Sequence, residues 1–209
     1  MRVELEPDPV PLARITASLV RRSLAAWSGG GPLARARGVI VLASATDPQA
    51  VTLRIGADCI SIRRGADADA DVSITMDLAD ADAKPKVEGA AKHPVLALAA
   101  AKLLEPPVGD WQAEADRFFE RAMAHADCPR PVRLVATDVD GHGRQQQWGG
   151  AGDPVIEIHG QAARLAAAMS GSAVVAEEVL NGRLFVVADL RDLSLLTKYA
   201  IDHLFGELV

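Results

Sequence analysis

The sequence predicts an α+β protein with two related halves, each a mainly antiparallel, twisted sheet covered by helices. Short β-branched runs bounded by turn residues are typical of strands, and they occur in both halves, at 51–55 and at 132–136. Each run is followed by a hairpin and then by a second strand-like run, at 71–76 and at 153–158. The first valine and the later aspartate are 20 residues apart in one half and 21 in the other. This recurrence predicts an internal repeat.

The first helix is predicted over 12–27. Pro9 and Pro11 precede it, and proline suits a helix start because the first turn leaves its N–H groups unpaired. Apolar residues from Leu12 to Trp27 recur at helical spacing. The Ser-Gly-Gly-Gly-Pro run at 28–32 ends the helix, because glycine and proline both interrupt helical structure.

Four strands are expected to follow in the first half. They lie at 38–43, 50–55, 58–63 and 71–76. Gly56 and Ala57 leave room only for a tight turn, so the second and third strands are predicted to form a hairpin. The acidic loop at 65–71 lacks the closing glutamate of a calcium-binding loop, which favours a solvated turn.

Two helices are predicted next, at 94–104 and 111–125. Trp111, Phe118 and Phe119 share one face of the second helix, a spacing typical of core residues.

The boundary between the halves is predicted at 127–131. Two prolines flank Arg130 there, and they would end the helix and stiffen the connection. The predicted domains are therefore 1–126 and 132–209, joined by the linker 127–131.

The second half alternates strands and helices. Strands are predicted at 132–136, 143–148, 155–158 and 184–187, and helices at 161–169, at 173–180 and from 190 toward the C-terminus. The turn at 138–143 is expected to join the first two strands as a hairpin. No closing strand like 184–187 is evident in the first half.

Composition excludes several classes of function. The chain has 22 Lys and Arg against 28 Asp and Glu, a net charge of −6, which argues against a phosphate-binding surface and against nucleic acid as a partner. Cys59 and Cys128 form no Cys-x-x-Cys pair, so neither a disulfide framework nor a zinc site is expected. The apolar runs are too short to span a bilayer, and the first residues do not resemble a signal peptide. We therefore expect a cytoplasmic protein with no transmembrane segment.

No catalytic motif is present in the sequence. It contains neither a Gly-x-Ser-x-Gly elbow nor a His-Glu-x-x-His pair nor a phosphate loop. The five histidines are widely spaced, and His159 is the one nearest a predicted buried strand. The sequence thus predicts no enzyme, no cofactor and no metal ion.

The second half resembles the sterol carrier protein type-two family of lipid-binding domains. The resemblance rests on the run 153–158, the Leu180-Asn181-Gly182-Arg183-Leu184 turn, and the strand end Val187-Ala188-Asp189. Ala188 departs from the glycine that the family usually has there. The first half would be a degenerate second copy.

The resemblance implies an apolar tunnel between the sheet and the helices, closed by the last helix. Carried onto this chain, it places seven residues in the tunnel wall: Leu165, Met169, Val175, Val179, Leu196, Tyr199 and Leu204.

The resemblance implies noncatalytic binding or transfer of a fatty acyl chain, a sterol or a similar apolar molecule. One alternative is a protein-interaction or accessory module whose core is filled by its own side chains. A second is an accessory domain of a thiol-dependent isomerase or acyltransferase. It would need a catalytic domain elsewhere in the chain, and it would be favoured if His93, His142 or His159 met a carboxylate in one cleft. The sequence is also compatible with a homodimer. An apolar pocket of about 300 Å³ or more would favour the lipid.

Overall fold

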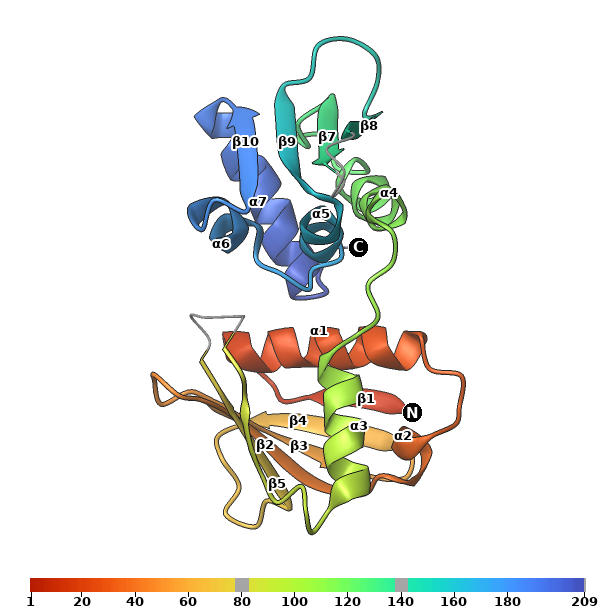
Figure 1. The fold of residues 1–209 in the computed structure, drawn as a ribbon, viewed down its shortest axis with the longest axis vertical. Coiled ribbons are helices and arrows are strands. Elements are labelled where there is room, and N and C mark those ends of the chain that lie inside the picture. The colour runs from red at the N-terminus through yellow and green to blue at the C-terminus, as the bar shows by residue number, and fades with distance from the viewer. Residues whose placement is uncertain (78–82, 138–142, 209) are drawn as a thin grey trace. The chain divides into compact units, whose positions relative to one another are not determined.

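The computed structural model describes residues 1–77, 83–137 and 143–208 of the chain. They form two compact units, Met1–Pro107 and Val108–Val209, each with its own sheet and its own apolar core (Figure 1). The α+β class predicted from the sequence is confirmed. Among the described residues, no helix has both the length and the apolar character needed to cross a membrane.

The sheet of the first unit has the strand order β1-β4-β3-β2-β5-β6. Its strands are β1 (Arg2–Leu5), β2 (Gly38–Ser44), β3 (Ala50–Ile55), β4 (Cys59–Arg64), β5 (Val72–Met76) and β6 (Lys86–Glu88). β3 is antiparallel to both β2 and β4, so the hairpin predicted at Gly56 and Ala57 is confirmed. β1 is parallel to β4, and β2 is parallel to β5, which makes the sheet mixed.

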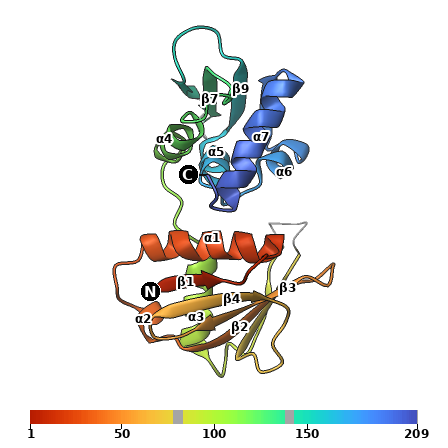
Figure 2. The same ribbon diagram turned by 180° about the vertical axis from the view of Figure 1, so that it is seen from behind.

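Helices cover one face of this sheet. They are α1 (Pro11–Ala25), α2 (Pro32–Arg35) and α3 (Pro94–Leu104). α1 contacts β1, β3, β4 and α3. Figure 2 shows the strands in front of α3, so α3 lies against the far face of the sheet in that view. The apolar side chains of α1 and α3 meet Ile40, Leu53 and Ile62 of the strands in one buried cluster.

Polar residues occupy the opposite face of the same sheet. Side chains alternate along a strand, so the residues between the core positions of β3 and β4 point away from the helices. These residues are Thr52, Arg54, Ser61 and Arg63. Arg54 and Arg63 are exposed, and Thr52 is buried.

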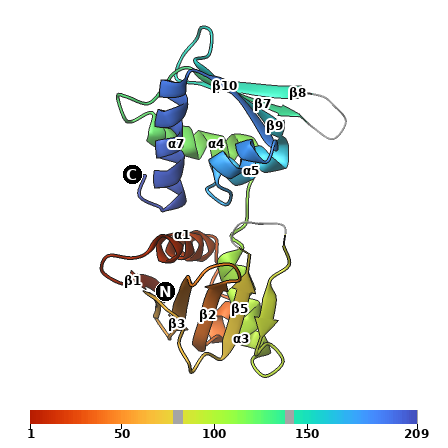
Figure 3. The same cartoon turned by 90° about the vertical axis from the view of Figure 1, so that its left-hand side faces the viewer.

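The second unit has a four-stranded mixed sheet in the order β10-β9-β7-β8. Its strands are β7 (Val132–Thr137), β8 (Gly143–Trp148), β9 (Ile156–Gln161) and β10 (Leu184–Ala188), and its helices are α4 (Trp111–Ala122), α5 (Ala162–Met169), α6 (Val175–Leu180) and α7 (Leu190–Leu204). β7 is antiparallel to β8 and parallel to β9, which is antiparallel to β10. Figure 3 shows α4 and α5 on the same side of this sheet.

The two sheets share one pairing pattern. In the first unit the chain of pairs β3-β2-β5-β6 is antiparallel, parallel and antiparallel, and β8-β7-β9-β10 in the second unit has the same sequence of pairings. The strand that takes the position of β7 is therefore β2, and not the run 51–55 that the sequence comparison aligned with it. β6 takes the position of β10, although no closing strand was expected in the first half.

The division of the chain differs from the predicted boundary at 127–131. α4 was expected to end the first half, but Trp111, Phe118 and Phe119 are buried in the core of the second unit, where the Phe119 ring stacks on Trp148 with 4.9 Å between centroids. The segment 127–131 is fixed within that unit, because Cys128 is buried and the Arg130 guanidinium donates to the His125 carbonyl at 3.0 Å. Along the chain, the first unit ends at Pro107 and the second begins at Val108 instead.

Candidate functional site

The seven residues predicted to line a tunnel all lie in the helices of the second unit. Leu165 and Met169 belong to α5, Val175 and Val179 to α6, and Leu196, Tyr199 and Leu204 to α7. Val179 is partly buried, and the other six are at most 8% exposed. All but Leu204 belong to the core cluster of this unit or pack against it, so the structure brings them together as a packed interior.

The space beside these residues is small. A cavity of about 30 Å³ lies between α6 and α7, and Val175 and Leu204 are among the residues that line it. This volume holds about one or two water molecules. An acyl chain could enter here only if α6 and α7 moved apart. The prediction that the seven residues line a ligand tunnel stays a prediction.

Tyr199 makes a polar contact at the edge of this interior, where Asp127 is exposed. Its hydroxyl donates a hydrogen bond to the Asp127 carboxylate, and its side chain is 1% exposed. Burial, followed by the hydrogen bond to Asp127, raises the pKa of Tyr199 to about 12. The same hydrogen bond lowers the pKa of Asp127. The contact fixes the segment after α4 to the last helix.

A larger, mainly apolar cleft lies in the first unit. It has a volume of about 550 Å³ and is formed by the C-terminal ends of α1 and α3 and the loop between α1 and α2. Its apolar lining comes from Ala26, Trp27, Pro32, Leu33 and Pro107. Sites for small molecules usually measure about 300–1,000 Å³, and the volume of this cleft falls within that range.

Two hydrogen bonds hold the walls of the cleft. The Ser23 hydroxyl donates to the Leu103 carbonyl at 3.0 Å and thereby links α1 to α3. The Trp27 indole N–H donates to the Gly30 carbonyl at 2.7 Å, which folds the loop back over the end of α1. Lys102 and Glu105 add charged groups to the lining.

Sequence reasoning missed this cleft, although one signal was present. Trp27, near the end of a predicted helix, is followed by Ser28 and then by three successive glycines. Gly29, Gly30 and Gly31 have no atoms within 4 Å of the position that a side chain would take. Glycines beside a partly buried ring leave open space that larger residues would fill.

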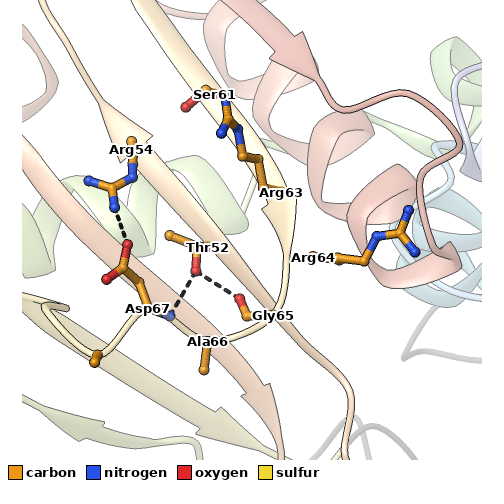
Figure 4. Close-up of a pocket in the computed structure, with 9 residues that line it drawn as sticks. Thr52, Arg54, Ser61, Arg63, Arg64, Gly65, Ala66 and Asp67 are labelled. Carbon is orange, nitrogen blue, oxygen red and sulfur yellow. Dashed lines mark hydrogen bonds and ion pairs between the residues drawn. The ribbon is translucent and has the colours of Figure 1, made fainter.

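A second cleft lies on the polar face of the same unit (Figure 4). It has a volume of about 390 Å³ and is lined by β3, β4 and the loop that follows β4. The buried Thr52 hydroxyl donates to the Gly65 carbonyl at 2.7 Å and accepts from the Asp67 N–H at 3.1 Å, which fixes that loop. The acidic loop at 65–71, predicted to be a solvated turn, thus forms one wall of a basic cleft.

Within the described residues, the histidines belong to no group of three or more His, Cys, Asp or Glu side chains that could hold a metal ion. His93 Nε2 lies 3.7 Å from the Asp71 carboxylate in the first unit, and His159 Nε2 lies 2.7 Å from Glu157 in the second. His142 falls outside the part of the chain that the structure describes.

Comparison with known proteins gives one partial likeness. No protein-family model matches the chain, and no curated protein matches it. Among solved structures, the chain is similar to sterol carrier protein 2 like 2 from Aedes aegypti, with 15% sequence identity and a TM-score of 0.32. The similarity covers 42% of this chain and 93% of that chain. It defines neither a family nor a ligand for this protein.

Proposed function

We propose that the protein binds an apolar small molecule, such as a fatty acyl chain, without catalysing a reaction. The supporting observation is the cleft of about 550 Å³ at the ends of α1 and α3, whose lining is mainly apolar. Each methylene group that leaves water contributes about 0.8 kcal/mol. A chain of several methylenes could therefore offset the cost of ordering the ligand in a cleft that is open on one side.

The polar residues of the cleft suit an amphipathic ligand. The apolar part would lie against Trp27 and Leu33, and a carboxylate would meet the ammonium group of Lys102. Lys102 is exposed, and the structure gives it no ion pair with any described residue. A fatty acid is therefore the ligand class that the cleft fits best.

The test is calorimetric titration of the whole protein with a medium-chain fatty acid that stays monomeric in water. Ala26 lines the cleft and Ala25 does not, although both are exposed and adjacent in sequence. We expect Ala26→Glu to weaken binding about tenfold or more, because it places a charge in an apolar wall. Ala25→Glu is the matched control and should bind like the unmodified protein.

A second comparison locates the carboxylate. Lys102→Gln should weaken binding of the acid and leave binding of the alcohol with the same chain length unchanged. Equal binding by the Ala26→Glu and Ala25→Glu variants, or no binding by the unmodified protein, would contradict the proposal. Binding that only substitutions in α6 or α7 reduce would instead point to the predicted wall of the second unit.

A second candidate function is self-association through the second unit. β10 is an edge strand, and its outer face carries Phe185 at 66% exposure and Val187 at 54%. An exposed edge strand can pair with its own copy about a two-fold axis. Light scattering would show a dimer that Phe185→Lys dissociates, whereas a monomer at all concentrations would exclude this function.

A further inference from the structure

We propose that the polar cleft on the outer face of the first sheet binds a terminal phosphate group, either of free inorganic phosphate or of a lipid headgroup. The cleft is formed by neighbouring positions on β3 and β4. Arg54 lies directly opposite Ser61 in the register, and Thr52 lies opposite Arg63. Directly opposed residues of antiparallel strands have Cβ atoms about 4.5–5.5 Å apart. The side chains of Arg54, Ser61 and Arg63 therefore reach the same space.

The side chains of Arg54, Arg63 and Ser61 can donate hydrogen bonds to a ligand in this space. Arg54 makes an ion pair with Asp67 of the loop, and an arginine carries five N–H donors. Within the described ranges, the structure gives the Arg63 guanidinium and the Ser61 hydroxyl no partner. Figure 4 shows Ser61 and Arg63 next to each other on the same side of β4. Arginine suits this role because its planar guanidinium can donate two parallel hydrogen bonds to a phosphate.

The third arginine of the cleft is already engaged elsewhere. Arg64 Nε lies 3.3 Å from the Glu6 carboxylate, and its guanidinium also donates to the Asp8 carbonyl at 3.3 Å. Figure 4 shows it pointing away from Arg54 and Arg63. This direction agrees with the alternation of side chains along β4. Arg64 therefore helps to hold the N-terminal segment, while Arg54 and Arg63 face the cleft.

The local charge favours an anion even though the chain as a whole is acidic. Glu4 of β1 lies opposite Ser61 of β4, and the Glu4 carboxylate forms an ion pair with Arg2. Asp67 pairs with Arg54. With those pairs formed, Arg63 leaves one unneutralised positive charge beside the Ser61 hydroxyl. The net charge of −6 argued against a phosphate-binding surface, but it is a sum over the whole chain and does not describe this face.

The buried Thr52 gives the site a fixed wall. Its hydroxyl bonds to both Gly65 and Asp67, so the loop that carries the Asp67 carboxylate is held against β3. A loop fixed before the ligand arrives lowers the ordering cost of binding. This site is independent of the apolar cleft, because its residues lie on the face of the sheet that points away from α1 and α3.

The test uses nuclear magnetic resonance of the whole protein titrated with inorganic phosphate, at constant ionic strength with chloride as the balancing anion. We expect saturable shifts of the Arg54 and Arg63 side-chain signals and of the 65–68 backbone amides. Arg63→Gln should weaken binding about tenfold, as expected when a hydrogen bond to a charged group is lost. Ser61→Ala should weaken it several-fold with no change of charge.

The control is Arg21→Gln. Arg21 is an exposed arginine on α1 and does not line the cleft. This variant loses the same charge as Arg63→Gln and should bind phosphate like the unmodified protein. If the Arg21 and Arg63 variants weaken binding equally, the effect is that of overall charge and the proposal fails.

A second arm identifies the source of the phosphate group. Phosphatidylcholine vesicles with and without phosphatidic acid are sedimented with the protein and its variants. Binding only to vesicles with phosphatidic acid, lost in Arg63→Gln and Ser61→Ala, would identify a lipid headgroup as the ligand. Saturable binding of free phosphate without vesicle binding would identify a soluble phosphate. If neither probe binds, the proposal is overturned.

Discussion

The two units share a pattern of four paired strands but differ in what lies against it. In the second unit the connection between β9 and β10 runs from 162 to 183 and includes α5 and α6, whose Leu165 and Met169 are buried in the core. In the first unit the corresponding connection runs only from 77 to 85. That unit has the larger sheet and an open apolar cleft.

The difference shows how one strand pattern can give a filled or an open interior. Helices inserted after the third strand of the pattern add apolar side chains to the interior of the second unit. The first unit extends its sheet with β4 and β1 instead, and β4 shares the polar outer face with β3. The same pairing therefore supports a packed core in one unit and accessible clefts in the other.

The largest expected effect tests whether α4 belongs to the second unit. Phe119→Ala removes a ring that is 1% exposed and stacked on Trp148, so the second unit should lose about 3–5 kcal/mol of unfolding free energy. Hydrogen exchange read by mass spectrometry should show lost protection in β7 and β9 and unchanged protection in β2 and β5. Leu180→Ala removes an exposed apolar side chain of the same unit and should change little. Equal loss of protection in both units would contradict the division at Pro107.

A smaller effect is expected where the chain enters the second unit. The buried Glu114 carboxylate accepts from the Gly109 N–H at 2.7 Å and pairs with Arg117 at 2.6 Å. Glu114→Ala should cost about 1–2 kcal/mol, because a hydrogen bond to a charged group is lost while the exposed ion pair contributes little. Chemical denaturation measures this cost. Glu120→Ala removes an exposed carboxylate from the same helix and is the control; a similar loss in both variants would mean that Glu114 acts only through its charge.

The smallest expected effect concerns the ionisation of Tyr199, the one tyrosine of the chain. Its ultraviolet titration should have a midpoint near 12, against about 10 for an exposed tyrosine. Because the folded pKa is raised, the stability linked to Tyr199 is present below about pH 10 and is lost as the pH rises toward 12. Asp127→Asn should lower the midpoint, though not fully to 10, since burial is the larger cause. An unchanged midpoint would show that Asp127 does not influence the tyrosine.

Asp127 itself gives the opposite dependence on the acid side. The hydrogen bond from Tyr199 lowers its pKa, so its contribution is present above the unfolded value of about 3.9 and is lost as the pH falls through the folded pKa.

Local patterns predicted most of the elements but not their partners. The helix at 94–104 and the strands at 50–55 and 143–148 follow from periodicity and turn residues. The helix predicted over 111–125 is present and ends at Ala122. Periodicity shows that α4 has an apolar face, but it does not say which sheet that face covers. This is why α4 was assigned to the wrong half. β1 and β6 are short edge strands that lack a distinctive pattern, and they were missed.

The clefts depend on features that a single sequence does not contain. The polar cleft exists because the register of β3 and β4 sets Arg54 opposite Ser61, and register is a property of the folded sheet. The apolar cleft exists because the ends of two helices, far apart in sequence, converge beside glycines. The sequence indicated an apolar ligand through a resemblance in the second half, whereas the larger apolar cleft is in the first.

The hydrogen bond from Ser23 to the Leu103 carbonyl, at 3.0 Å, links the first helix of its unit to the last. During synthesis, the N-terminal helix must therefore wait for nearly the whole unit to leave the ribosome before its packing is complete. The residues of the first unit's core cluster all precede Pro107 in the sequence. The protein can thus fold in two successive stages as it is made, with the first unit finished while the second is still being translated.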